Sequence, residues 1–184
     1  MIMNIAAPKF LCGSILNAAI LGTVVLCSNI ARAENAFDQF SRPGVVRLEP
    51  GNDQAKNQPV SLKGPAVVQF WASWCVGCRK NMEAVLEMVM GSPVNFVTVS
   101  LDENPEAARN YLQRSGAKAA TLQAATLVDT KQQIAEALKI SSVPTTLFID
   151  RDGRITSRIV GHISAGDIRK IRDDYSAQAK LGLK

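Results

Sequence analysis

Two cysteines at a separation of three residues are the side chains of this 184-residue chain best suited to chemistry. Cys75 and Cys78 stand in the stretch Trp-Cys-Val-Gly-Cys, between an apolar run that predicts a buried strand and an amphipathic pattern that predicts a helix. Thiols at this spacing can form a reversible disulfide. At a helix start, free backbone N–H groups and the helix dipole favour a thiolate on the first cysteine, and the second lies within reach to resolve a mixed disulfide.

A Cys-x-x-Cys pair alone is a weak signal, because half a zinc site or two inert core thiols would share its spacing. Structural zinc needs four ligands, and the chain after residue 33 offers only these two thiols and one histidine, His162. Three nearby methionines could suggest a soft metal, but Met82 belongs to the apolar stripe of the predicted helix. We therefore predict no bound metal.

The N-terminal segment indicates the compartment in which the thiols would work. Lys9 precedes an uncharged run over residues 10–30, and Ala-Arg-Ala follows at 31–33. This pattern predicts a secretory signal peptide, residues 1–33, whose removal releases the protein into the periplasm. The alternative is an uncleaved membrane anchor, because the apolar run is marginally long enough for a span.

Cleavage would remove Cys12 and Cys27 and leave one pair of thiols in the mature chain. A scaffold held together by disulfides is then excluded, because one short bridge restrains little of the unfolded chain. The remaining length suits one domain with its own core. The net charge of +5 is mild and the basic residues are scattered, which argues against a nucleic-acid partner.

Strands and helices are predicted to alternate after a polar lead-in over residues 34–64, in which one short strand is expected. The predicted strands cover residues 45–48, 66–71, 94–101, 125–129, 145–150 and 154–160. The predicted helices run from the cysteines to Gly91, from Asn104 through Leu112, over 132–138, and from Ser164 through Tyr175, the last with a capping-box acid at Asp167. This alternation predicts an α/β fold, a central mixed sheet flanked by helices, in one domain over residues 65–180.

A second motif, Ser-Ser-Val-Pro-Thr-Thr, places Pro144 at the opening of a strand that would be interior. Proline donates no hydrogen bond to a neighbouring strand, so it favours a special role there, such as a cis peptide bond that exposes the preceding backbone. A trans proline that merely leads the strand is the alternative.

Together these residues resemble the thioredoxin superfamily, and most closely its exported TlpA-like, ResA-like and DsbE-like thiol-disulfide reductases. The resemblance covers about residues 60 to 175. Its markers are Gln69 to Cys75 with Cys78, Ser100 to Pro105, Val143 to Thr146, and Val160 to His162. It implies a thioredoxin-like fold, with a TlpA-like central insertion between Tyr111 and Ile140.

For the reaction, the resemblance implies that Cys75 is the exposed nucleophile and that Cys78 is the resolving thiol. No cofactor beyond their redox-active disulfide is implied. Pro144 would be the cis-proline, with the backbone of Val143 pairing with a substrate segment. Trp74 and Gly161 would lie beside that segment.

Two further residues could assist the pair. Arg79 lies one turn after the first cysteine and could stabilise its thiolate, or it could be a solvated basic residue. His162, in the loop that by resemblance lines the groove, could assist proton transfer or could simply be exposed.

The chain departs from the family at its buried acids. Thioredoxins have an aspartate where this chain has Gln69 and a lysine where it has Thr98, and the TlpA-like branch tends to have a glutamate where it has Asn81. A carboxylate relay is the family's assumed route for deprotonating the resolving thiol. These replacements leave open how Cys78 loses its proton.

These observations predict an exported thiol-disulfide oxidoreductase that reduces protein disulfides. Val76 and Gly77 leave no histidine between the thiols, which argues against a strong oxidant, and the resemblance to the TlpA-like branch implies reduction. The expected partners are a client protein with a disulfide or dithiol and a membrane-bound electron donor, and the expected state is a monomer. The alternative, motivated by the missing acids, is a non-catalytic thiol adaptor or copper-site assembly factor on the same fold.

Overall fold

The computed structural model describes residues 35–56 and 62–181 of the chain. The predicted signal peptide, residues 1–33, lies outside the described residues. Within the described part, no helix combines the length and apolar character needed to cross a membrane.

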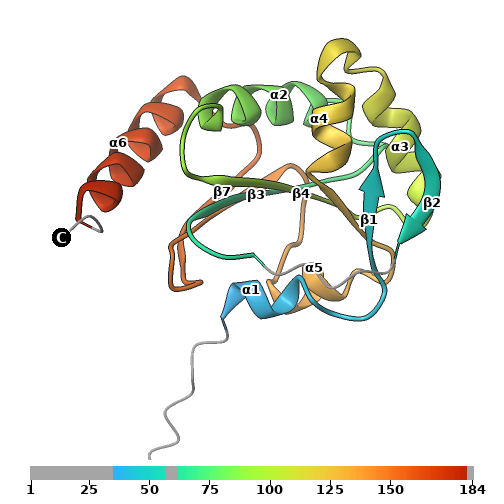
Figure 1. The fold of residues 1–184 in the computed structure, drawn as a ribbon, viewed down its shortest axis with the longest axis horizontal. Helices are drawn as coiled ribbons and strands as arrows, with labels where there is room; N and C mark the ends of the chain where they lie inside the picture. Colours follow the sequence, from blue (N-terminus) through green and yellow to red (C-terminus); the bar gives the residue numbers. More distant parts are fainter. Residues whose placement is uncertain (1–34, 57–61, 182–184) are drawn as a thin grey trace, which may run out of the picture. The chain divides into compact units, whose positions relative to one another are not determined.

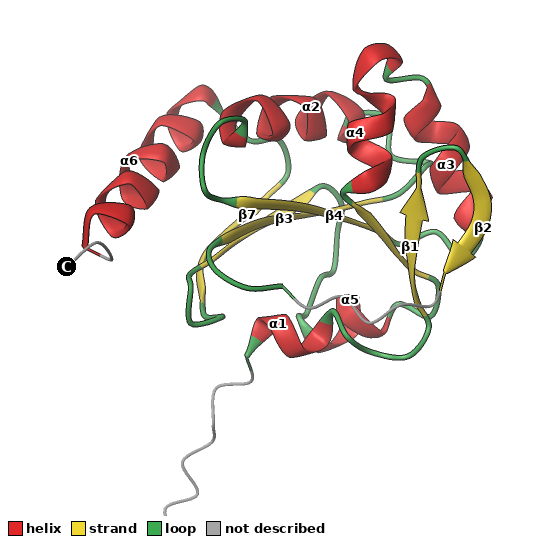
Figure 2. Cartoon of the chain, viewed as in Figure 1, coloured by secondary structure: helices red, strands yellow, loops and turns green. Residues whose placement is uncertain are grey.

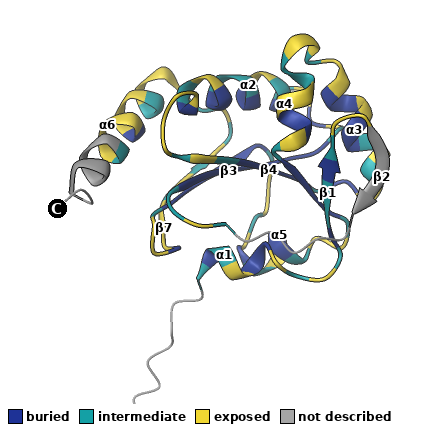
Figure 3. Cartoon of the chain, in the orientation of Figure 1, coloured by how far each residue is buried: buried dark blue, intermediate teal, exposed yellow. Residues whose placement is uncertain are grey.

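A mixed sheet forms the centre of the described chain (Figure 1). Seven strands are described, in the order β2-β1-β5-β4-β3-β6-β7. They are β1 (Val45–Glu49), β2 (Asn52–Lys56), β3 (Ala66–Trp71), β4 (Asn95–Ser100), β5 (Thr126–Asp129), β6 (Thr145–Ile149) and β7 (Ile155–Val160). Strands β3, β4 and β5 are parallel, whereas β6 runs antiparallel to β3 and forms a hairpin with β7. Every residue of β3 is buried, as its continuous apolar run predicts (Figure 3).

Helices cover both faces of this sheet (Figure 2). They are α1 (Ala36–Gln39), α2 (Cys78–Val89), α3 (Pro105–Gln113), α4 (Ala119–Ala124), α5 (Gln133–Ala137) and α6 (Ala165–Leu181). α1 and α5 enclose one core cluster on one face, and α2, α3, α4 and α6 enclose two others on the opposite face. The cysteine pair lies on the second face.

The predicted helix starts and stripes are confirmed. The side chain of Asn104 accepts a hydrogen bond from the backbone N–H of Glu106 at 2.9 Å and caps α3. At the start of α6, the N–H of Asp167 donates to Ser164 Oγ at 3.1 Å, and the N–H of Ser164 donates to Asp167 Oδ2 at 2.9 Å. The Ser164 hydroxyl also donates to Asp167 Oδ2 at 2.5 Å, and this bond, together with that from the Ser164 N–H, lowers the pKa of Asp167. In α2 the predicted apolar stripe is buried, from Cys78 to Val89.

The lead-in holds more structure than its sequence predicts. Besides the expected strand β1, it contains α1, capped by Asn35, and β2, which pairs with β1. β1 also pairs with β5, and Phe40 and Leu48 are fully buried in the core. β2 escaped prediction because its sequence, Asn-Asp-Gln-Ala-Lys, has no apolar alternation and the strand is held by backbone pairing at the sheet edge.

The segment between α3 and β6 contains the predicted strand β5 and helix α5, and also a helix that was not predicted. A 3-10 turn over Gly116–Lys118 leads into α4, which has six residues. Two turns of helix are too few to give a clear 3.6-residue period. Its Leu122 is nevertheless fully buried, against the face of the sheet that carries the cysteines.

Candidate functional site

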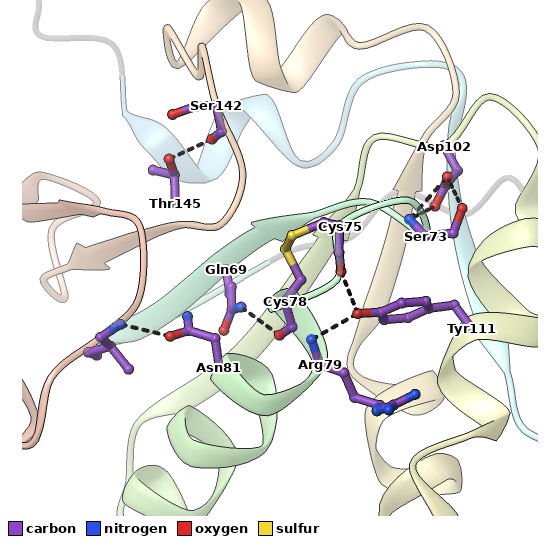
Figure 4. The surroundings of a disulfide bond; sticks show 11 residues. Gln69, Ser73, Cys75, Cys78, Arg79, Asn81, Asp102, Tyr111, Ser142 and Thr145 are labelled. Atoms are coloured by element: carbon purple, nitrogen blue, oxygen red, sulfur yellow. Dashed lines mark hydrogen bonds between the residues drawn. A yellow bond between two sulfur atoms is a disulfide. The ribbon is translucent and has the colours of Figure 1, made fainter.

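The sulfur atoms of Cys75 and Cys78 are joined in a disulfide, with an S–S distance of 2.02 Å and a Cα–Cα distance of 5.5 Å (Figure 4). The pair follows the C-terminal end of β3 and leads into α2. The N–H of Cys78 donates to the carbonyl of Cys75 at 3.3 Å, which closes the turn. α2 begins only at Cys78, so Cys75 lies in the turn ahead of the helix rather than in its first turn.

The two sulfur-bearing residues differ in access. Cys75 has 8% of its surface exposed and Cys78 has none. Cys75 is therefore less exposed than expected, but it is the only residue of the pair that solvent reaches. A partner sulfur could approach Cys75 and not Cys78.

A tyrosine hydroxyl joins the two ends of the redox turn, which is the turn over residues 75–78. Tyr111 Oη donates to the carbonyl of Cys75 at 2.8 Å and accepts from the backbone N–H of Arg79 at 2.9 Å. Its ring stacks on Trp71 with centroids 5.1 Å apart, and the guanidinium of Arg114 lies 5.0 Å from its centroid. The sequence placed Tyr111 on the buried face of α3 and gave no sign of this role, because the contact joins segments 36 residues apart.

Asp102 fixes the segment that leads into the turn. Its carboxylate accepts hydrogen bonds from the backbone N–H of Ser73 at 3.0 Å, from Ser73 Oγ at 2.7 Å and from Ser100 Oγ at 2.6 Å. Asp102 is buried, with 7% of its surface exposed. The Ser-Leu-Asp marker in the sequence therefore has a local purpose, which is to hold the backbone just before Cys75.

The positions at which related proteins have charged residues carry neutral, hydrogen-bonded side chains in this chain. Gln69 Nε2 donates to the carbonyl of Cys78 at 3.4 Å. Asn81 Oδ1 accepts from the N–H of Ile163 at 2.7 Å. Thr98 Oγ1 accepts from the indole N–H of Trp71 at 3.0 Å. Gln69, Asn81 and Thr98 are all buried, and none of the three side chains is a carboxylate.

The proline motif lies next to the pair. The peptide bond between Val143 and Pro144 is cis. Val143 packs against the core cluster that contains both cysteines, and the N–H of Gly161 donates to the carbonyl of Pro144 at 2.8 Å. The structure thus brings Val143, Pro144 and Gly161 together beside the disulfide.

Large apolar side chains are exposed around the accessible part of the turn. Trp74 is 71% exposed and Val76 is 97% exposed, although both are apolar and flank Cys75 directly. Val160, at the end of β7 just before Gly161, is 63% exposed. Exposed apolar groups gathered at a reactive centre are typical of a surface that binds another molecule.

The two predicted auxiliary residues are placed differently. The guanidinium of Arg79 lies 5.8 Å from the ring centroid of Tyr111, and Figure 4 shows its side chain leading away from the sulfur atoms. His162 is exposed, and its imidazole lies against Gly77, inside the redox turn. No group of three or more His, Cys, Asp or Glu side chains that could hold a metal occurs in residues 35–56 and 62–181.

The fold and this site match a known family. The model of the thioredoxin-like domain matches residues 53–176. The chain belongs to the thioredoxin-like family. The predicted α/β thioredoxin-like fold is thereby confirmed, and the cysteine pair and the cis-proline lie in its matched region.

Several relatives of this thioredoxin-like chain have names that describe thiol chemistry. The thiol-disulfide oxidoreductase ResA of Bacillus subtilis is 28% identical over 166 residues, which cover 88% of this chain and 87% of the relative. The thiol:disulfide interchange protein DsbE homolog of Paracoccus denitrificans is 30% identical over 148 residues, covering 80% and 71%. The match with ResA of Bacillus thuringiensis and Bacillus anthracis spans only 57% of each relative.

Solved structures share the fold of this thioredoxin-like chain. A secreted disulfide oxidoreductase of Mycobacterium tuberculosis, described as homologous to E. coli DsbE, has a TM-score of 0.57 at 17% identity and covers 74% of this chain and 98% of its own. StoA from Bacillus subtilis has a TM-score of 0.52 at 20% identity, covering 71% and 98%. At these identities the likeness concerns the fold alone.

Proposed function

We propose that the chain is an exported thiol-disulfide oxidoreductase that reduces disulfides of client proteins. The observation that carries the proposal is the pair Cys75–Cys78, joined in a disulfide of which only the first residue is accessible, beside the cis peptide bond at Pro144. The names of the relatives support the reaction class. Redox chemistry of this kind needs no cofactor beyond the two sulfur atoms.

The proposed reaction is a two-step thiol exchange. In the reduced protein, the Cys75 thiolate attacks one sulfur of a client disulfide, a Cys75–client disulfide forms, and the other client sulfur leaves as a thiolate. The Cys78 thiolate then attacks the sulfur of Cys75, which releases the second client thiol and forms the Cys75–Cys78 disulfide. The client gains two electrons, and a membrane-bound dithiol donor restores the reduced protein.

The client is proposed to bind as an extended segment next to the cis-proline. The backbone of Val143 would pair with the segment, while Trp74 and Gly161 would flank it. The exposed apolar side chains at Trp74 and Val76 supply a surface that such a segment would cover. All the residues that would contact the segment lie within or next to the redox turn.

Trapping of the mixed disulfide tests the reaction. A Cys78→Ala variant cannot resolve the intermediate, so it should remain joined to clients through Cys75 in the export compartment. The matched control, Cys75→Ala, retains one thiol but lacks the accessible one, and should capture nothing. Equal capture by both variants, or capture by neither, would contradict the mechanism.

Direction and compartment need measurements of their own. A reductase should equilibrate with glutathione at a potential more negative than about −230 mV, whereas a strong oxidant lies near about −120 mV. Export predicts that the mature protein is recovered from the periplasm with an N-terminus at Glu34, directly after the predicted cleavage site. An intact N-terminus in the membrane fraction would support the anchored form instead.

A further inference from the structure

The imidazole of His162 occupies the space in which a side chain of residue 77 would lie. A Cβ atom built on Gly77 would be 2.4 Å from Cε1 and 2.5 Å from Nε2 of His162, far closer than atoms can approach. The backbone of Gly77 has φ −87° and ψ −12°, a conformation open to any residue. Gly77 therefore leaves the room that the imidazole occupies, and its backbone freedom is not needed at this position.

Both neighbours of His162 are hydrogen bonded through their backbone N–H groups, which fixes the backbone of the loop that carries the imidazole. On one side the N–H of Gly161 donates to the carbonyl of Pro144 at 2.8 Å. On the other, the N–H of Ile163 donates to Oδ1 of buried Asn81 at 2.7 Å. Asn81 stands where the TlpA-like branch tends to have its acid. In this chain the amide at that position anchors the loop that carries the histidine.

The histidine shares its surroundings with few titratable groups. The cis-proline loop, residues 141–144, contributes none. The titratable side chains in the parts of the chain nearest the histidine loop are Cys75 in the turn, Cys78, Arg79, Lys80 and Glu83 in the first two turns of α2, and Asp167 in the first turn of α6. Asp167 already accepts hydrogen bonds from Ser164, and the Arg79 guanidinium lies over Tyr111.

We propose that His162 is the proton acceptor for the Cys75 thiol. This inference rests on the proposed thiol exchange. In the reduced protein the Cys75 thiol gives its proton to the imidazole, which leaves a thiolate next to an imidazolium. When the thiolate attacks a client disulfide, the imidazolium returns that proton to the client thiolate that leaves. In the second step the Cys78 proton passes to the second client sulfur as it leaves, so two protons and two electrons reach the client.

The chemistry of the two groups suits this exchange. Imidazole is the side chain that ordinarily changes its charge between pH 5 and 8. A thiolate is the nucleophilic form of cysteine, and a neighbouring imidazolium stabilises it. The sequence has no histidine between the two cysteines. His162, in the loop after β7, places an imidazole against the same turn.

Three variants of the full-length mature protein test the proposal: His162→Ala, Gly77→Ala and the double variant. The probe is the alkylation of reduced Cys75 by iodoacetamide from pH 5 to pH 9, with the modified cysteine identified by mass spectrometry. His162→Ala should slow alkylation near pH 6.5 by about tenfold, the effect of one pKa unit on the thiolate fraction. Gly77→Ala should slow it to a similar extent, because its methyl group must displace the imidazole.

The double variant distinguishes a direct contact from two unrelated effects. If the methyl group acts only by displacing the imidazole, adding Gly77→Ala to His162→Ala should change neither the alkylation rate nor the urea midpoint further. Additive slowing would contradict the contact. If Gly77→Ala alone does not fold, the pH profile of His162→Ala still decides the role, because His162 is exposed and its loss should not unfold the protein.

Two controls match these variants. Gly166→Ala adds a methyl group in α6, where the nearest atom, Ser164 Oγ, is at an ordinary 3.5 Å, and should leave alkylation unchanged. Lys80→Gln removes an exposed charge from the first turn of α2 and should slow alkylation by less than about twofold. Alkylation of His162→Ala within twofold of wild type at every pH would overturn the proposal. Client capture by Cys78→Ala would still stand in that case, which separates failure of this proposal from failure of the proposed function.

Discussion

The hydroxyl of Tyr111 provides the sharpest test of how the redox turn is held. Tyr111→Phe removes the donor to the Cys75 carbonyl, at 2.8 Å, and the acceptor for the Arg79 N–H, at 2.9 Å. The ring remains, so its stacking on Trp71 should be retained. The variant therefore isolates two hydrogen bonds at opposite ends of the turn.

The expected cost follows from the burial of the groups that lose a partner. A net hydrogen bond contributes about 1 kcal/mol, and a buried group left without a partner costs more. The Cys75 carbonyl keeps the weaker bond from the Cys78 N–H at 3.3 Å. We expect the oxidised variant to lose about 2 kcal/mol of unfolding free energy, which lowers the urea midpoint by about 1 M for a domain of this size.

The same variant should shift the reduction potential, because folding and disulfide formation are linked. The disulfide holds the turn in register with the hydroxyl, so the loss of stability should be larger in the oxidised form than in the reduced form. A difference of about 1 kcal/mol raises the potential by about 20 mV, since about 30 mV corresponds to 1.4 kcal/mol for two electrons.

Urea unfolding of both redox forms and equilibration with glutathione measure the two sides of this relation. Tyr175→Phe is the matched control, because its hydroxyl donates to the carbonyls of Ala66 and Ile149 at 3.0 and 3.3 Å, away from the redox turn. It should lose stability without a change in potential. An oxidised Tyr111→Phe protein within 0.5 kcal/mol of wild type, on the order of a surface substitution, would refute the reasoning.

Three further variants test other parts of the structure. Asp102→Ala removes the acceptor of Ser73 and should cost about 3 kcal/mol in urea unfolding, as expected for bonds to a buried charged group. Because the Trp74 side chain is exposed, Trp74→Ala should change the free energy of unfolding by less than about 0.5 kcal/mol. It should nevertheless weaken client capture in the Cys78→Ala background. Desolvation raises the pKa of Asp129. Its stabilising contribution is therefore present at acidic pH and is lost as pH rises through that raised pKa. The stability of wild type relative to Asp129→Asn should be greater at about pH 3.5 than at about pH 7.

The parts of the fold that are long and periodic were predictable from sequence. β3 is a continuous apolar run and α2 has a regular buried stripe, so each pattern had one interpretation. The hairpin of β6 and β7 was marked by its Arg-Asp-Gly turn. The elements that were missed, α1, β2 and α4, are all short, with four to six residues each.

Within the site, sequence and structure contribute different things. Cys75, Cys78 and Pro144 could be named because spacing and residue type alone set them apart. Tyr111 could not, since its apolar ring satisfied the helix pattern and nothing local indicates where a hydroxyl points. The contact between His162 and Gly77 could not be predicted either. A glycine in a turn is ordinarily explained by a positive φ angle, and only the structure shows that Gly77 has a φ angle of −87°.

The N–H groups at the start of α2 show why a histidine would matter in this chain. The helix dipole and free N–H groups would ordinarily stabilise a thiolate on Cys75. Here the N–H of Cys78 donates to the Cys75 carbonyl and that of Arg79 donates to Tyr111 Oη, so both are already engaged. The buried amides of Gln69 and Asn81 carry no charge that could take up a proton. These two N–H groups are therefore not free to stabilise the thiolate, and the imidazole of His162 is a titratable group that contacts the turn at Gly77.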